Sequence, residues 1–158
     1  MASELPSHEL TLERFDPGDQ WDPDGVLFGT VAGHEVAVRV LLNVDEWAGL
    51  EIGRAYRVSL DFERYGAVRV VGEASPGIGF ERSPRGRLIG RVVELLDDDW
   101  VRLESFIVLD VDLATTPTIP RPAGLTVGHL LEVDGMLEGH LEDELAVEVC
   151  ADASKSPP

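Results

Sequence analysis

The chain of 158 residues contains a single cysteine, Cys150, so no disulfide can form within it. No apolar run approaches the length of about 20 residues that a membrane-spanning helix needs. The first ten residues, MASELPSHEL, have neither the basic start nor the apolar stretch of a secretory signal. These absences predict a cytoplasmic protein that has no contact with a membrane.

Positive charge is scarce as well. Thirteen basic side chains stand against 30 acidic ones, for a net charge of −17, and Lys155 is the only lysine. The deficit is spread evenly, with a balance of −8 over residues 1–80 and −9 over residues 81–158. A surface that is negative throughout repels nucleic acids and anionic membranes and attracts basic proteins. The composition therefore predicts a basic protein partner and disfavours nucleic acid, and solubility alone is the alternative explanation of the charge.

The sequence also lacks long stretches in which apolar residues recur with the 3.6-residue period of a helix. Apolar residues instead alternate with polar ones, as they do in half-buried strands. The segments read as strands are residues 26–31, 35–42, 56–63, 67–71, 87–96, 100–113, 127–141 and 144–151. Residues 43–48 form a short connection of about one helical turn. Many short strands without a long helix predict an all-β fold, either a small β-barrel or a sandwich.

Three places decide how these strands are connected. Ala32-Gly33-His34 and Tyr65-Gly66 each predict a tight turn between neighbouring strands. Residues 100–113 alternate without interruption and predict one long strand. Asp134-Gly135 has the composition of a hairpin turn, but a straight strand keeps the apolar residues on one face. We therefore predict a single strand there, bent at Gly135 and Gly139.

One stretch of the chain occurs twice. AGLEIGRAYRVSLDFE over residues 48–63 returns 75 positions later as AGLTVGHLLEVDGMLE over residues 123–138. A shorter match, LFGTV over residues 27–31, returns as LIGRV over residues 88–92 after 61 positions. Similarity at a fixed spacing is typical of repeated structural units, so we predict a duplicated β unit.

The duplication divides the chain into five parts. They are a loose N-terminal arm (1–20), a first β unit (21–71), a linker loop (72–86), a second β unit (87–151) and a disordered tail (152–158). If the units are equivalent, Gly29 and Gly90 occupy equivalent bends. Gly53 and Gly128 then begin equivalent strands.

Each unit carries the pattern L-x-G-x-V near its start, followed by G-L-x-[IV]-G-x-x-x-x-V, and GHLLEVDG over residues 128–135 begins a late strand. These patterns resemble those of OB-fold proteins, in which a glycine lets the first strand bend. The resemblance covers residues 86–141 and, more loosely, residues 25–72. It implies a small β-barrel that binds single-stranded nucleic acid. That function requires one groove to be lined by Arg57, Arg69, Arg102 and the arginines of residues 82–91.

The strongest candidate site is a local reversal of charge. Four arginines lie within ten residues and beside several glycines: Arg82, Arg85, Arg87 and Arg91. Such a cluster binds an anion or an acidic partner, or else it pairs with the chain's own carboxylates. We add Trp100 and Phe106 to this binding site, because large aromatic side chains often anchor a protein partner.

Signatures of catalysis are missing. The sequence has no G-x-S-x-G nucleophile turn, no histidine pair with zinc spacing and no phosphate-binding glycine loop. We therefore expect a binding or assembly module that is not an enzyme and holds no cofactor or metal. An inhibitor or immunity-type protein that covers a basic target is one such module. The alternatives are the OB-like nucleic-acid reading and a small enzyme or ligand-binding barrel whose acid–base groups are Asp110, Asp112 and Glu132.

The net charge predicts a response to salt and to mild acid. Self-repulsion destabilises the folded chain, and salt screens it over a Debye length of about 10 Å at 0.1 M. The melting temperature should rise between roughly 10 and 150 mM salt. Acidification to about pH 5.5 should be tolerated or stabilising, because crowded carboxylates take up protons more readily in the folded state. Thermal melts at about pH 7.5 and 5.5 check this, and a midpoint that stays flat or falls with salt contradicts it.

Overall fold

In the computed structural model of the chain, the described residues are 7–18, 24–72, 77–78, 83–97, 99–114 and 124–142. The predicted strand over residues 144–151, the predicted tail over residues 152–158, Arg82 and most of the predicted linker lie outside them. In the described part, strands dominate and one short helix is present, which confirms the all-β prediction. The elements are β1 (Ser7–Asp16), β2 (Asp24–Val31), β3 (His34–Leu41), α1 (Val44–Ala48), β4 (Ala55–Val71), β5 (Gly77–Ile78), β6 (Arg85–Leu95), β7 (Trp100–Glu104), β8 (Val108–Asp112) and β9 (Leu130–Leu141).

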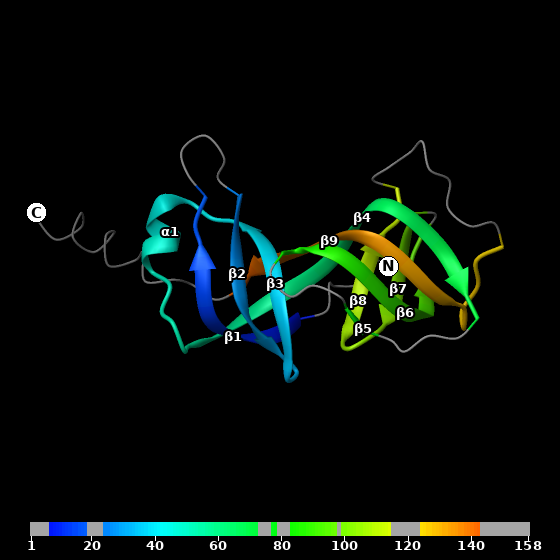
Figure 1. Cartoon of the computed structure of the whole chain (residues 1–158), viewed down its shortest axis with the longest axis horizontal. Helices are drawn as coiled ribbons and strands as arrows, with labels where there is room; N and C mark the ends of the chain where they lie inside the picture. Colours follow the sequence, from blue (N-terminus) through cyan, green and yellow to red (C-terminus); the bar gives the residue numbers. More distant parts are fainter. Residues whose placement is uncertain are drawn as a thin grey trace, which may run out of the picture.

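The strands form one mixed sheet that closes on itself. Their order is β1-β2-β3-β9-β4-β8-β7-β6-β5, and the additional pairings β1–β4 and β9–β6 close it. Two circuits result: β1-β2-β3-β9-β4 and β6-β7-β8-β4-β9. Figure 1 shows them as two lobes, with β4 and β9 running from one into the other. Both lobes are therefore built on the same pair of long strands.

The pairing of β4 with β9 is antiparallel and has Phe62 opposite Leu137 near its centre. These two residues lie 75 positions apart, so the ladder relates the two strands by a local two-fold axis through this pair. At Gly135 a Cβ would lie 2.1 Å from the carbonyl oxygen of Glu63, so only glycine lets the strands approach this closely. The prediction that Asp134-Gly135 lies within a continuous strand is confirmed.

The starts of β4 and β9 are built alike. Gly53 and Gly128 precede them with φ of +89° and +100°, in the left-handed region that favours glycine. The N–H of Gly53 donates to the carbonyl of Leu12 at 2.7 Å, and that of Gly128 to the carbonyl of Val92 at 2.8 Å. The prediction that these glycines begin equivalent strands is confirmed, and β6 takes the place of β1 in the second lobe.

The predicted equivalence of Gly29 and Gly90 is wrong. Gly29 lies in β2, whereas Gly90 lies in β6, the counterpart of β1. Both glycines lie where a neighbouring strand comes close. An added Cβ at Gly29 would lie 2.1 Å from the carbonyl oxygen of Thr11, and one at Gly90 would lie 3.0 Å from the carbonyl oxygen of Glu104. A close approach of the neighbouring strand thus favours glycine at both positions, although the two strands are not equivalent.

The loose arm predicted over residues 1–20 is wrong for Ser7–Asp16, which form β1. This strand pairs with both β2 and β4. Leu10 and Leu12 are fully buried in the core of the first lobe. Their alternation with polar neighbours is the signal of a strand, but it covers too few apolar residues to stand out.

Two further predictions about connections are wrong. Tyr65-Gly66 is not a turn, because β4 continues to Val71 through an irregularity after Arg64. The buried guanidinium of Arg64 donates there to the carbonyls of Gly66 (2.8 Å) and Leu113 (3.1 Å), which satisfies a bulged backbone. Residues 100–113 form two strands, β7 and β8, with a reversal at residues 105–107.

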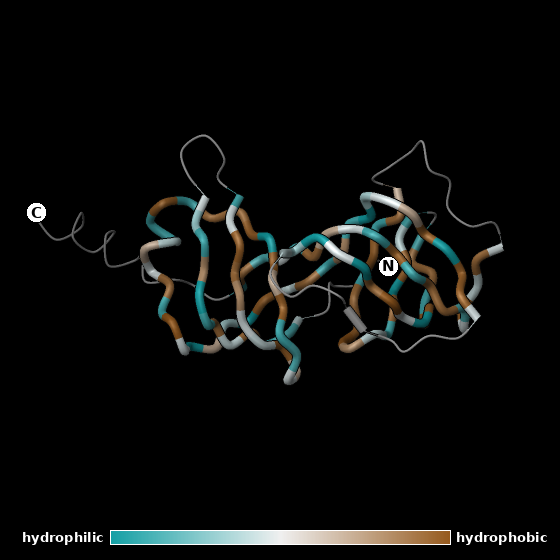
Figure 2. The backbone as a smooth tube through the Cα atoms, in the orientation of Figure 1, coloured by the Kyte–Doolittle hydropathy of each residue, from teal (hydrophilic) through white to brown (hydrophobic). Residues whose placement is uncertain are grey.

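The tight turn between β2 and β3 is confirmed, with positive φ at Ala32 and Gly33. The predicted helical turn is α1, whose N-cap Asn43 and Glu46 accept each other's backbone N–H groups. From α1, the indole of Trp47 stacks on Phe15 at 5.7 Å and closes one end of the first lobe. Figure 2 shows apolar and polar residues alternating along the strands, as expected of a sheet with one buried face.

The close approach of β4 and β9 at Gly135 generates a stability prediction. Gly135→Ala pushes a methyl group against the Glu63 carbonyl and should lower the free energy of unfolding by roughly 1–3 kcal/mol. Gly72→Ala is the matched control, because a Cβ there meets nothing within 4 Å, and should change it by less than about 0.5 kcal/mol. Urea unfolding of both variants measures this. If the two substitutions lowered the free energy of unfolding equally, β4 and β9 would be able to move apart at Gly135 without a loss of stability.

Candidate functional site

The described members of the arginine cluster share one face of β6 but do not form an empty anion site. Arg87 lies 3.8 Å from Glu132 and 3.6 Å from Asp134. Arg91 donates to the carbonyl of Gly128 at 2.6 Å. The guanidinium of Arg85 lies 5.6 Å from the centre of the Tyr65 ring. Of these three arginines only Arg87 lies beside the chain's own carboxylates, so the assignment of the cluster as a binding site stays a prediction.

The two predicted aromatic anchors lie apart. Trp100 begins β7, whereas Phe106 lies beyond the other end of that strand, in the reversal that leads to β8. The Phe106 ring packs edge-on against His34 at 5.3 Å. Phe106 therefore joins the tips of the β2–β3 and β7–β8 hairpins and contributes to the contact between the lobes.

The structure brings together five carboxylates, of which the sequence pattern singled out Asp110 and Asp112 and missed the other three. They lie where the lobes meet, on the face of β3-β9-β4-β8 opposite the core. The register of β3, β9, β4 and β8 places these side chains in one row across the sheet. Arg39 pairs with Glu138, Glu138 with Asp61, and Asp61 with Asp110. One step along the strands, Glu63 pairs with Asp112. We call the following five residues the junction cluster: Asp61, Glu63, Asp110, Asp112 and Glu138.

Two arginines hold the ends of this row. Arg39 Nη2 lies 2.5 Å from Glu138 Oε1, and Arg39 Nη1 lies 3.5 Å from Asp24. Arg102 binds Asp110 through two nitrogens, Nε to Oδ1 at 2.7 Å and Nη2 to Oδ2 at 3.2 Å. A two-point guanidinium–carboxylate pair is strong, and here it compensates the buried charge of Asp110. Asp110 is therefore a buried partner of Arg102.

The middle of the row is short of positive charge. Burial raises the pKa of Asp61 to about 6; Glu63, Asp110 and Asp112 add to the rise, and His140 opposes it. The Asp61 Oδ1 atom is buried and has no hydrogen-bond partner in the described part of the chain. The pKa of Glu63 is raised to about 7, mainly by a hydrogen bond with Glu138 and to a smaller extent by burial. Burial also raises the pKa of Asp112. These carboxyl groups are desolvated without being fully paired.

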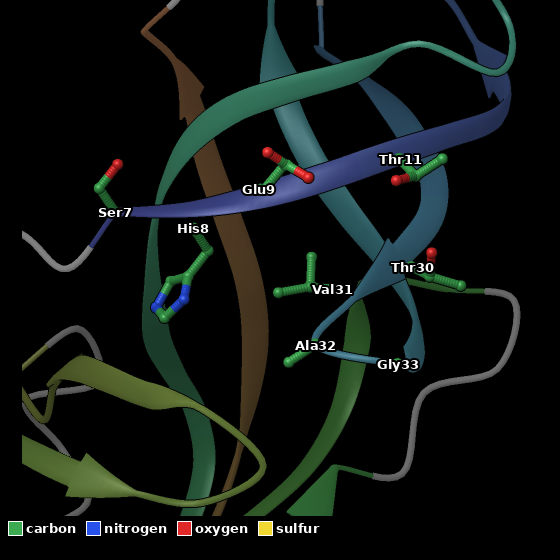
Figure 3. A pocket seen from close by; sticks show the side chains of 8 residues that line it. All are labelled: Ser7, His8, Glu9, Thr11, Thr30, Val31, Ala32 and Gly33. Atoms are coloured by element: carbon green, nitrogen blue, oxygen red, sulfur yellow. The ribbon is translucent and has the colours of Figure 1, made fainter.

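Acid–base catalysis would need such groups to face a cavity. A hollow of about 520 Å³ lies elsewhere, between β1 and the β2–β3 turn (Figure 3). Its lining is Ser7, His8, Glu9, Thr11, Thr30, Val31, Ala32 and Gly33. Only one carboxylate, Glu9, is among them, and the His8 ring turns away to contact the carbonyl of Val108 at 3.1 Å. This hollow does not bring two acid–base groups together.

The three carboxylates of the enzyme alternative do not converge. Asp110 is held by Arg102, and Asp112 Oδ1 accepts the N–H of Ala114 at 2.9 Å. Glu132 binds Arg69 at 2.6 Å, and it lies on β9 four residues from Met136, which is level with Glu63 and Asp112. At about 3.3 Å per residue, this places Glu132 roughly 13 Å away along the strand.

Among the described residues, no three histidine, cysteine or acidic side chains are arranged to hold a metal ion. In that same part of the chain, no helix is both long and apolar enough to cross a membrane. Comparisons of the chain with protein-family models, with curated proteins and with solved structures found no match. The evidence for function is therefore the geometry of the chain itself.

The Arg102–Asp110 pair generates the second stability prediction. Arg102→Met leaves the Asp110 carboxylate buried and uncompensated, which should lower the free energy of unfolding by about 3–5 kcal/mol. Arg54→Met is the control, because its pair with Glu51 is exposed and should contribute less than about 1 kcal/mol. Denaturant unfolding compares them. Similar effects would mean that water or rearrangement satisfies Asp110.

Proposed function

We propose that the chain is an internal duplication of an OB-like unit, in which each copy lends its last long strand to the other. The first circuit runs β1-β2-β3-β9-β4 and returns to β1, with α1 between β3 and β4. The second runs β6-β7-β8-β4-β9 and returns to β6. Both follow the strand order expected of the five-stranded OB fold. The repeated 75-residue spacing of β4 and β9 supports this proposal.

The proposed function is a non-enzymatic module that binds a basic protein partner at the junction cluster. The observation that carries it is the excess of desolvated carboxylates there. Among the described residues Arg39 binds Glu138 and faces Asp24, and Arg102 binds Asp110 and Glu94, so Asp61, Glu63 and Asp112 form no ion pair there and are compensated only in part, by the charges of His140 and Arg39 and by the N–H of Ala114. A cation from a partner would stabilise their charged forms.

Further negative charge surrounds this position. Asp97 and Asp99, before β7, add to the raised pKa of Asp112 through their charges. A lysine or arginine placed on the junction cluster would therefore meet carboxylates from β4, β8 and the β6–β7 turn together. The net charge of −17 adds long-range attraction, which increases the rate of encounter with a basic protein. An inhibitor or immunity-type protein that covers a basic target is one form of such a module.

Single-stranded nucleic acid fits this surface less well. The arginines that the OB-like reading requires lie far apart: Arg57 and Arg69 are separated by 12 residues on β4, about 40 Å of strand. Arg69 is bonded to Glu132, and Arg102 to Asp110. The structure thus offers these cations to the chain's own carboxylates.

Affinity capture with the immobilised full chain tests the proposed function. The wild type should retain one or more proteins of basic pI from a native lysate. Asp61→Asn combined with Asp112→Asn removes two of these partly compensated charges without changing side-chain volume. The affinity of the captured protein, measured by calorimetry, should fall at least roughly tenfold and should weaken further with salt.

The matched control is Glu9→Gln combined with Glu35→Gln, which removes the same charge from exposed positions of β1 and β3. This control should bind within about twofold of the wild type. Equal weakening by both double variants would show that only net charge matters. Retention of the same proteins by wild type and junction variant would overturn the proposal.

A further inference from the structure

We propose that the hollow beside β1 is a docking groove for an extended, basic segment of a partner protein. The segment pairs with residues 7–9 of β1 as an added strand. The observation that carries this is a difference between the lobes, because the position that is hollow in the first lobe holds β5 in the second. The groove lies apart from the junction cluster, so the inference does not depend on the function proposed for that cluster.

The strands β1 and β6 occupy equivalent positions in the two lobes. The N–H of Leu12 in β1 donates to the carbonyl just before β4 at 2.9 Å, and the N–H of Val92 in β6 donates to the carbonyl just before β9 at 2.8 Å. From these bonds the β1–β4 and β6–β9 ladders continue in the same register. Residues 7–9 of β1 therefore correspond to residues 87–89 of β6.

The first three residues of β1 have one unpaired edge. Successive residues of a strand direct their N–H groups to alternate edges. Because the N–H of Leu12 points toward β4, those of Ser7 and Glu9 point away from β4 and toward the hollow. In the described part of the chain no strand meets this edge there, since the β1–β2 ladder ends at the Leu10–Val31 pair. Figure 3 shows the β2–β3 turn facing β1 across the hollow.

In the second lobe the equivalent edge is covered. There β5 pairs antiparallel with β6, and Gly77 lies opposite Ile89, the counterpart of Glu9. The carbonyl of Ile89 also accepts the hydroxyl of Ser105 at 2.6 Å. The counterpart of Ser105 is Val31, which has no hydroxyl to donate. Among the described residues, the edge of β1 thus lacks both partners that the same edge of β6 has, and β5 shows how an added strand fits.

The lining of the hollow determines the chemistry of the added strand. Where the second lobe has Ile89, the first has Glu9, whose exposed carboxylate forms no ion pair within the described part of the chain. Backbone hydrogen bonds hold an added strand of any sequence, and a carboxylate beside it selects lysine or arginine. The net charge of −17 attracts the same segment. Three residues of β1 span about 10 Å, so a short extended segment is sufficient.

Titration of the full chain with a capped pentapeptide of alternating valine and lysine tests the proposal by NMR. Hydrogen exchange at the amides of Ser7 and Glu9 should slow by at least roughly tenfold at saturation, because these N–H groups gain partners. A pentapeptide of alternating valine and glutamate should bind at least roughly fivefold more weakly. The lysine peptide N-methylated at alternate residues should leave the exchange unchanged, because it cannot pair with the strand.

Two substitutions at one position separate backbone pairing from charge. Glu9→Pro removes an N–H that points to the hollow and that the β1–β4 ladder does not use, so it should abolish binding of the lysine peptide. Glu9→Gln is the matched control, because it removes the same charge but keeps the N–H, and it should bind within about fivefold of the wild type. The junction variant, Asp61→Asn with Asp112→Asn, should bind the peptide as the wild type does, so failure of this proposal and failure of the proposed function are distinguishable.

Three results would overturn the proposal. Slow exchange at Ser7 and Glu9 in the chain without peptide would show that this edge already has a partner. Equal binding of the lysine peptide by Glu9→Pro and the wild type would show that the edge is not used. Equal binding of all three peptides by the wild type would do the same, and this comparison holds even if Glu9→Pro does not fold.

Discussion

The ladder of backbone hydrogen bonds between β4 and β9 is the interaction on which the rest of the structure depends. One end of β4 pairs with β1 and its middle with β8; β9 pairs first with β6 and then with β3. The strands β1, β3, β6 and β8 pair with these two, and β2 and β7 complete the circuits between them. Gly135 permits the close approach that the ladder requires. The junction cluster lies on this ladder, so stability and the proposed function share one set of residues.

Local patterns predicted the parts of the fold that depend on near neighbours. The Ala32-Gly33 turn needs two positive φ values, and the Asn43–Glu46 capping box lies within four residues. The 75-residue repeat correctly paired the starts of β4 and β9. Even the decision against a hairpin at Asp134-Gly135 rested on the alternation of one segment. The turn and the capping box depend only on contacts between residues that are near neighbours in the sequence.

Other parts depend on contacts that no local pattern contains. The bulge in β4 is stabilised by Arg64, whose partner carbonyl at Leu113 is 49 residues away. The junction cluster combines residues of β4, β8 and β9 whose register is set across the sheet. Alternation did place Asp61 on a polar face, and the repeat aligned Glu63 with Glu138. Neither pattern shows that the parallel pairing of β3 with β9 brings Arg39 beside these carboxylates, or that the parallel pairing of β4 with β8 brings Asp112 there. The arginine cluster was visible in the sequence, but the position of Arg87 beside Glu132 and Asp134 was not.

Sharing two strands also constrains how such a chain can evolve. A domain is ordinarily a unit that genes can gain, lose or exchange, because it folds from its own residues. Neither lobe here has that independence, since each completes its circuit with a strand from the other half of the sequence. A gene for one half would encode an incomplete sheet, which a second copy of the same product could complete. If the chain arose by the duplication proposed above, the simplest ancestor is a symmetric pair of short chains, whose exchange of strands fusion would have made permanent.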